Sequence, residues 1–150
     1  MSDNSIKLRW FNTKVENGRT MVFDPIRKIY CTLTPEEKVR QETLYMLVEQ
    51  LHVPSGLIAV EYSIKVNSLN KRCDAVVFNT MREPLMIVEC KANSVKISNK
   101  TLDQAIRYFS ALRPRFILLT NGLTYHCFHI HENTISHLYQ IPDYETMLSK

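Results

Sequence analysis

The stretch Pro84-Leu85-Met86-Ile87-Val88-Glu89-Cys90-Lys91-Ala92 is a run of apolar residues that ends in charged ones. Residues of a β-strand alternate between its two faces, so Glu89 and Lys91 are expected on one face and Cys90 on the other. A strand this apolar belongs in the centre of a sheet, where charges are costly unless they have partners or a function. The stretch therefore predicts both the core of the fold and a candidate site at its end.

The segment before this strand carries a second acid that can reach the same place. Residues Arg72–Asn79 predict a strand, and the turn at 80–83 joins it to the next strand as a hairpin. The strand period of two then allows Asp74 to lie beside Glu89. Two carboxylates suit Mg²⁺, which binds one or two of them and keeps several waters, and Lys91 can hold or deprotonate a water near a phosphate. The alternative is that Glu89 and Lys91 form an ordinary exposed ion pair, which would stabilise the fold by about 0–1 kcal/mol.

The residues after the strand predict the rest of a layered sheet. Asn99–Leu112 has apolar residues at helical spacing and ends before Pro114. The apolar segment Arg115–Thr120 is typical of a strand that is covered on both faces. Two further strands, Thr124–His131 and Ile135–Ile141, are expected to follow, and a polar tail ends the chain.

The residues before the hairpin predict a helix and one more strand. A capping Thr34 followed by proline marks a helix start, so a helix is expected over Pro35–Leu51, and a strand at Leu57–Val66 follows it. The apolar stripe of the helix, extended backwards at the helical period, reaches three polar residues, Gln41, Arg40 and Glu37. Glu37 is expected either to cap the first turn or to point at the sheet.

Three short strands are expected near the N-terminus, at Ile6–Phe11, Thr20–Asp24 and Lys28–Leu33, with a turn at Asn17-Gly18. The order of elements predicts a layered α/β (α+β) domain with a central mixed β-sheet, helices on both faces and an N-terminal β extension. The 150 residues match the usual size of a single domain, so one domain over residues 1–150 is expected.

Composition excludes several classes of function. The three glycines, Gly18, Gly56 and Gly122, lie too far apart for a phosphate-binding loop, so no nucleotide cofactor is expected. Four separate cysteines without a Cys-x-x-Cys pair favour free thiols in the cytoplasm. No apolar stretch reaches the roughly 18 residues of a membrane span, so no membrane partner is expected. The 19 Lys and Arg against 15 Asp and Glu give a net charge of +4, which suits a polyanion.

Taken together, these motifs resemble the PD-(D/E)XK nucleases, and in particular the N-terminal nuclease domain of type I restriction enzyme R subunits in a short stand-alone bacterial form. Arg72-Cys73-Asp74-Ala75-Val76-Val77 is similar to the first acidic motif, and Val88-Glu89-Cys90-Lys91-Ala92 is similar to the Glu-x-Lys motif. Asp103-Gln104-Ala105-Ile106-Arg107-Tyr108 resembles the Gln-x-x-x-Tyr element that follows the core. The segments 23–28 and 34–41 also resemble this group, so the likeness covers nearly the whole chain.

The resemblance implies hydrolysis of DNA phosphodiester bonds that depends on Mg²⁺, with Mn²⁺ as a substitute, on a restriction-endonuclease-like core. It implies that Asp74 and Glu89 bind the metal and that Lys91 orients or activates the attacking water. Glu37 becomes the auxiliary acid of the first helix, in agreement with its place on the inner face of that helix.

Contacts with DNA are expected from the family element and from basic residues. Gln104 and Tyr108 lie four residues apart on one side of a helix and can touch the DNA backbone or the lysine of the site; the alternative is a polar face in water. The further residues expected to bind nucleic acid are Arg40, Gln41, Arg72, Lys96 and Arg107.

The leading hypothesis is a metal-dependent DNA endonuclease, and two alternatives stay open. One is a non-catalytic DNA-binding or assembly module that keeps the nuclease fold. The other is a structural domain in which Asp74, Glu89 and Lys91 form a buried salt-bridge network. A homodimer is expected because one domain offers one site, and cutting both strands of a duplex usually needs two copies or two binding events.

Overall fold

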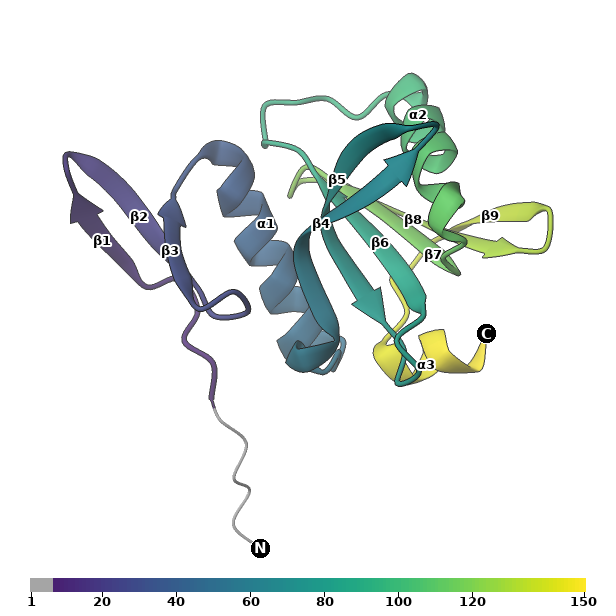
Figure 1. Cartoon of the computed structure of the whole chain (residues 1–150), viewed down its shortest axis with the longest axis horizontal. Coiled ribbons are helices and arrows are strands. Elements are labelled where there is room, and N and C mark those ends of the chain that lie inside the picture. The colour runs from purple at the N-terminus through teal and green to yellow at the C-terminus, as the bar shows by residue number, and fades with distance from the viewer. Residues whose placement is uncertain (1–6) are drawn as a thin grey trace, which may run out of the picture.

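The computed structural model describes residues 7–150 of the chain, apart from the side chains of Tyr108 and Ser110. A small N-terminal sheet, a long first helix and a larger sheet follow one another across the molecule (Figure 1). One π-helical turn, Met46–Gln50, continues the first helix, and 3₁₀ turns cover Ser55–Leu57 and Ser110–Leu112. The other elements are, in chain order, β1 Thr13–Glu16, β2 Arg19–Asp24, β3 Ile29–Thr32, α1 Pro35–Tyr45, β4 Ile58–Val66, β5 Leu69–Phe78, β6 Pro84–Cys90, α2 Asn99–Phe109, β7 Phe116–Thr120, β8 Tyr125–His131, β9 Thr134–Leu138 and α3 Tyr144–Ser149.

The larger sheet is mixed, with the strand order β4-β5-β6-β7-β8-β9. β6 and β7 pair parallel, and the other neighbouring strands of this sheet pair antiparallel. Parallel neighbours need a crossover connection, and α2 supplies it. It packs on one face of the sheet, whereas α1 and α3 pack on the other (Figure 1). A mixed sheet with helices on both faces confirms the predicted fold class.

The two parallel strands form the centre of the core. Every residue of β7 is buried, which confirms the prediction of a strand covered on both faces. One apolar cluster lies under α1 and α3 and includes Leu44 and Phe116, and a second lies under α2 and includes Ile87 and Phe109. Glu89 therefore lies near the end of a strand whose apolar residues are almost completely removed from solvent.

The small sheet is built on the turn at Asn17-Gly18. β1 and β3 each pair antiparallel with β2, on its two sides. The predicted strand Ile6–Phe11 is wrong for residues 7–11, which form no strand, and Ile6 lies outside the described residues. A two-residue turn pairs the residues directly before it with those after it, so the strand begins later. Trp10 packs edge-on against Tyr45 of α1 instead, with 5.8 Å between the ring centroids.

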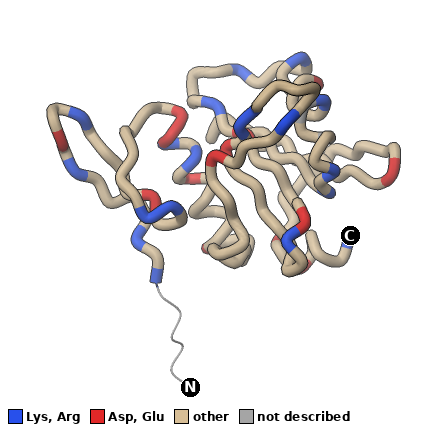
Figure 2. Tube along the Cα trace, in the orientation of Figure 1, with Lys and Arg blue, Asp and Glu red and all other residues tan. Residues whose placement is uncertain are grey.

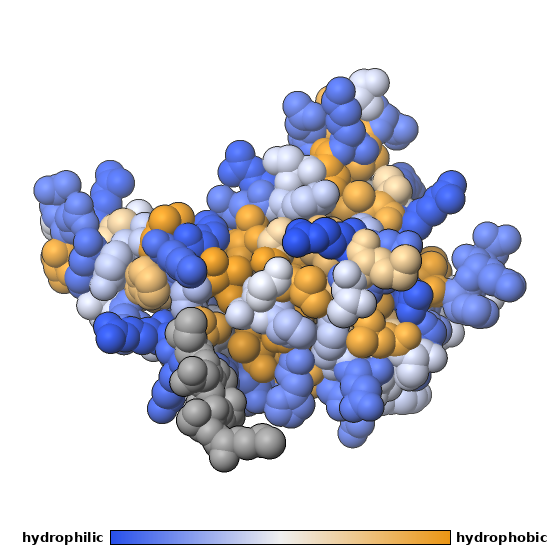
Figure 3. Space-filling model, turned by 60° about the horizontal axis from the view of Figure 1, so that its bottom comes forward, coloured by the Kyte–Doolittle hydropathy of each residue, from blue (hydrophilic) through white to orange (hydrophobic). Residues whose placement is uncertain are grey.

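This small sheet adds little to the apolar core. Within β1–β3, Val22 and Asp24 are buried, and neither belongs to the two apolar clusters. Val15, Ile29 and Tyr30 are exposed, and the space-filling view shows apolar residues at the surface of the small sheet beside hydrophilic ones (Figure 3). Its attachment to the rest of the molecule therefore relies largely on polar groups.

Two helical segments differ from their predicted form. The α-helical part of α1 ends at Tyr45, and the π-helical turn takes up the remaining residues of the predicted helix. α3 was predicted as a polar tail, but Asp143 caps it by accepting a hydrogen bond from the Thr146 N–H at 2.8 Å, and Tyr144 and Met147 are buried. Two buried residues one turn apart do not stand out among polar neighbours in a sequence. Within residues 7–150, no helix is long and apolar enough to cross a bilayer.

Gly122 holds the turn after β7 against α1, which leads to a first prediction. Its φ is +84°, and a Cβ atom there would lie 2.6 Å from Asn93 Nδ2 and 3.3 Å from Val39 Cγ2. We expect Gly122→Ala to lower the free energy of unfolding by about 1–3 kcal/mol, because both the backbone and the contacts are strained. Gly56→Ala is the control, since a Cβ there meets nothing within 4 Å. Equal urea denaturation midpoints for the two variants would contradict the prediction.

Candidate active site

The predicted acids meet on two adjacent strands. Ala75 of β5 pairs with Val88 of β6, so Asp74 lies opposite Glu89, and their carboxyl groups are within hydrogen-bond reach of each other. The Lys91 Nζ lies 3.7 Å from Glu89 Oε1. The convergence of two carboxylates and one ammonium, expected from the strand period, is therefore what the structure contains.

Backbone hydrogen bonds hold this end of the sheet in place. The Cys90 N–H donates to Asp74 Oδ2 at 2.7 Å, which fixes one carboxylate oxygen against β6. The Lys91 N–H donates to the Thr120 carbonyl at 2.8 Å, so the lysine leaves the sheet at a defined point. Asn93 then donates from Nδ2 to the Asn121 carbonyl at 2.7 Å, tying the loop after β6 to the turn after β7.

Burial changes the acidity of one member of this carboxyl pair. The pKa of Glu89 is raised to about 8, first by burial and then by the negative charge of Asp74. Glu89 Oε2 is buried and has no hydrogen-bond partner. With a pKa of about 8, Glu89 keeps its proton at neutral pH unless a cation that binds beside it takes the place of that proton.

The pair fits a hard divalent cation. Two carboxylates, one of them with a buried oxygen that lacks a partner, are the donor set with which Mg²⁺ binds while keeping several waters. Among the described residues no group of three or more His, Cys, Asp or Glu side chains gathers as a metal-binding cluster. A metal at this position would therefore take its remaining ligands from water or substrate.

The raised pKa of Glu89 leads to a second prediction, about stability without metal. Between about pH 4.5 and pH 8 the unfolded chain releases the Glu89 proton while the folded chain keeps it, so stability must fall as pH rises through this window. The loss should be on the order of 2–4 kcal/mol. We expect Glu89→Gln to flatten the decline in thermal unfolding temperature, and Mg²⁺ at alkaline pH to restabilise the wild type but not the variant. A wild-type chain with no pH dependence in EDTA would contradict this reasoning.

Glu37 points inward as predicted, but it does not join the pair directly. Its side chain is buried, its Oε1 lies 2.6 Å from Arg27 Nη2, and its Oε2 lies 3.0 Å from Arg40 Nε. Its backbone N–H also donates to Thr34 Oγ1 at 3.0 Å, so the expected helix cap is present too. Arg40 in turn places Nη2 3.3 Å from Asp74 Oδ1. Glu37 is thus linked to Asp74 through Arg40.

Arg40 and Gln41 lie inside the molecule. Arg40 is 8% exposed and Gln41 is 1% exposed, and neither amide atom of Gln41 has a hydrogen-bond partner. Their expected contact with nucleic acid stays a prediction. Burial gives Arg40 a different immediate role, which is to neutralise the acids around it.

A pocket of about 230 Å³ opens beside Glu89, between β5, β6 and α2. Arg72 and Gln104, both predicted as site residues, are among its lining residues, and Ala105, Phe109 and Leu119 form apolar parts of the wall. Its cationic lining residues are Lys71, Arg72 and Lys91. The side chain of Tyr108 lies outside the described residues, so its role stays a prediction.

The other two basic residues expected to bind nucleic acid are exposed. Lys96 lies in the loop before α2 and Arg107 on α2, and their contact with nucleic acid stays a prediction. Figure 2 shows further Lys and Arg positions along the tip of the β4–β5 hairpin, near α2. The cations thus gather on the side of the sheet where the pocket opens.

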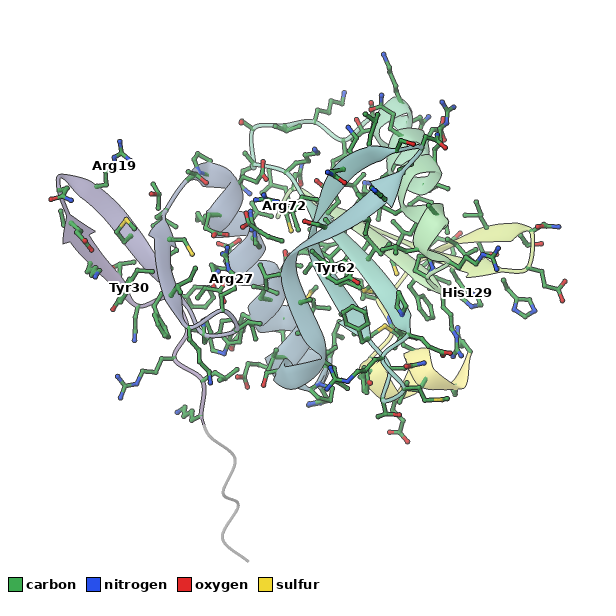
Figure 4. The ribbon with its side chains drawn as sticks, viewed as in Figure 1. Arg19, Arg27, Tyr30, Tyr62, Arg72 and His129 are labelled. Atoms are coloured by element: carbon green, nitrogen blue, oxygen red, sulfur yellow. The ribbon has the colours of Figure 1, made fainter. Side chains whose placement is uncertain are left out.

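Sequence reasoning missed three charged residues that belong to this region. Asp24 is fully buried, Arg27 follows it in the loop after β2, and Glu61 lies in β4. Figure 4 shows Arg27 between the small sheet and α1, with Arg72 nearby. The signal available was the spacing Asp24-x-x-Arg27, but its meaning depends on how the small sheet docks against α1.

Comparison with known protein families finds a matching family model. A family model described as the type I restriction enzyme R protein N terminus (HSDR_N) matches residues 35–142. The chain belongs to this family. The resemblance to the R-subunit N-terminal domain, read from the motifs, is thereby confirmed, and the matched segment contains every predicted site residue. A search of curated proteins finds no match.

Two solved structures share the fold of this R-subunit N-terminal domain. The fragment structure of a putative HsdR subunit of a type I restriction enzyme from Vibrio vulnificus YJ016 has a TM-score of 0.59 at 18% identity, over 78% of this chain and 25% of that chain. A putative nuclease belonging to DUF820 from Anabaena variabilis ATCC 29413 has a TM-score of 0.50 at 9% identity, over 97% of this chain and 88% of that chain. At these identities the likeness shows the fold, and the chain spans a quarter of the Vibrio fragment. The family match makes the chain an R-protein N-terminal domain, and the two structures show that its fold is shared.

Proposed function

We propose that this protein is a Mg²⁺-dependent DNA endonuclease. The observation that carries the proposal is the buried pair of Asp74 and Glu89, with an unpartnered Glu89 oxygen and a lysine 3.7 Å away. An ordinary salt-bridge network would satisfy these groups with one another. Here Glu89 has a buried oxygen without a partner, so a proton or a cation is needed to neutralise it.

Asp74 and Glu89 would hold the metal, which when bound supplies a polarised water and neutralises charge on a phosphate. Lys91 shares the face of β6 with Glu89 and lines the pocket, so its ammonium can hold a water or a phosphate oxygen there. Glu37 and Arg40 keep the Asp74 carboxylate in place from the α1 side. In this proposal the acid pair would lie on one side of the reacting phosphate and the lysine beside it.

DNA is the substrate that the surrounding charges favour. Lys71, Arg72 and Lys91 line the pocket, and Lys96 and Arg107 are exposed in the loop before α2 and on α2. Such residues bind phosphates without reading sequence, so the proposed binding weakens steeply with salt. Cutting both strands of a duplex would need two copies of this single site, and we propose a homodimer for that step.

Calorimetric titration with Mg²⁺ or Mn²⁺ tests the proposal, together with nicking of supercoiled DNA. We expect the wild type to bind the metal and nick DNA, and Asp74→Asn and Glu89→Gln to lose both properties. Glu145→Gln is the control, because this exposed acid lies on α3. A wild type that binds no metal would overturn the proposal. Metal binding without any cleavage would instead support a non-catalytic module that keeps the nuclease fold.

A further inference from the structure

Arg27, Glu37, Arg40 and Glu61 form a cluster of ion pairs beside the site, called here the Arg-Glu cluster, and Arg72 contacts its edge with Nη1 3.7 Å from Glu61 Oε2. Glu37 divides its two oxygens between the two guanidinium groups, and Glu61 does the same: its Oε2 lies 3.4 Å from Arg27 Nη1 and its Oε1 lies 3.2 Å from Arg40 Nη1. The four side chains carry two positive and two negative charges, and Arg72 adds a further positive charge at the exposed edge of the cluster.

The cluster is anchored on one side and joined to the site on the other. Arg27 places Nε 2.6 Å from Oδ2 of Asp24, which is fully buried in the small sheet. Arg40 uses two of its three nitrogens on the glutamates of the cluster and leaves Nη2 for Asp74, at 3.3 Å. Arg40 thus lies within ion-pair distance of three acids at once and contacts Asp74 through a single nitrogen.

The backbone conformation of Glu61 is also unusual, independently of these ion pairs. Its φ is +55°, and among the described residues it is the one non-glycine residue with a left-handed backbone inside a strand. The register of β4 and β5 runs from Val60↔Ala75 to Tyr62↔Cys73 and is interrupted at Glu61 and Asp74, which face each other. Such a conformation costs of order 1–3 kcal/mol and persists where surrounding contacts require it.

We propose that Glu61 is a positioning residue for the metal site, acting through Arg40 on Asp74; this inference rests on the proposed function. Loss of the Glu61 carboxylate frees Nη1 of Arg40 and leaves the cluster with a net positive charge. The guanidinium then turns further donors toward Asp74 and competes with the metal, and the added positive charge repels a divalent cation. Residues that support metal ligands from behind typically change metal affinity by about 10–100-fold when replaced.

The experiment compares substitutions at Glu61 by calorimetric titration with Mn²⁺ and by thermal unfolding. We expect Glu61→Gln, nearly the same size but neutral, and Glu61→Gly, which relieves the left-handed backbone, to bind Mn²⁺ about 10–100-fold more weakly while remaining folded. Glu61→Asp keeps a carboxylate and should recover part of the affinity. Glu132→Gly is the matched control, since Glu132 is exposed in the β8–β9 turn with φ of +54°.

The outcomes separate this inference from the proposed function. If the wild type binds no Mn²⁺, the proposed function fails before Glu61 is tested. If the wild type binds Mn²⁺ and folded Glu61→Gln binds it equally well, Glu61 has no positioning role and its strain serves the fold alone. A loss of affinity in Glu132→Gly equal to that in Glu61→Gly would also overturn the inference, because it would then come from the backbone change.

Discussion

Lys91→Ala is expected to reduce DNA cleavage by about 10²–10⁴-fold while leaving metal binding and stability close to those of the wild type. The lysine side chain is 35% exposed and its nearest acid, Glu89, is 3.7 Å away, so little folding energy depends on it. No coordinating oxygen is lost. The attacking water or the developing negative charge on the phosphate, however, loses its positive partner in the pocket.

Nicking assays with supercoiled DNA and calorimetric titration with Mg²⁺ measure the two halves of this expectation separately. Lys14→Ala is a suitable control, because Lys14 is an exposed lysine of the small sheet that pairs with Glu16 at 2.9 Å. Equal cleavage rates for Lys91→Ala and the wild type would show that Lys91 is a surface charge. If Lys91→Ala also bound the metal more weakly, the role of Lys91 would instead be to hold Asp74 and Glu89 in the geometry that binds it.

Arg40→Met is expected to have the largest effect on stability, on the order of 3–5 kcal/mol. The substitution keeps a long apolar stem but leaves buried Asp74 without its arginine and buried Glu37 with Arg27 alone. Adding Glu37→Gln to Arg40→Met should recover part of the loss, because a buried charge that has lost one of its two arginines is removed.

Urea denaturation supplies the measurement, and α1 itself supplies the comparison. Lys38 and Glu42 form an exposed ion pair on the same helix at 2.9 Å, so Lys38→Met should cost about 0–0.5 kcal/mol. If Lys38→Met and Arg40→Met shift the unfolding midpoint equally, the buried network contributes no more than a surface pair, and its role in the fold has been overstated.

Local patterns predicted the acid pair because its geometry is local. Asp74 and Glu89 sit on consecutive strands of a hairpin, where a period of two and a short turn determine which side chains are neighbours. The buried strand β7 was predictable for a similar reason, since continuous apolar sequence indicates a strand covered on both faces.

Arg27 and Glu61 were not predictable because their roles depend on long-range packing. Arg27 reaches Glu37 only after the small sheet has docked against α1, and the sequence contains no pattern for that docking. Glu61 looks like an ordinary polar residue of an alternating strand, and a left-handed φ leaves no mark on polarity. α3 was missed for a simpler reason, since two buried residues are too few to show a helical period.

The position of Arg27 has a consequence for how this domain can be divided. The segment shared with the family begins at residue 35, whereas Arg27 and its anchor Asp24 lie before that boundary. Deleting the small sheet would leave Glu37 with Arg40 alone and Glu61 with Arg40 and Arg72, and it would remove Val22 from the buried apolar residues. Any exchange of this domain between proteins at the family boundary would thus separate Arg27 from the strands that carry Asp74 and Glu89. We expect such an exchange to give a stable domain where the new N-terminal segment places a cation at the position of Arg27.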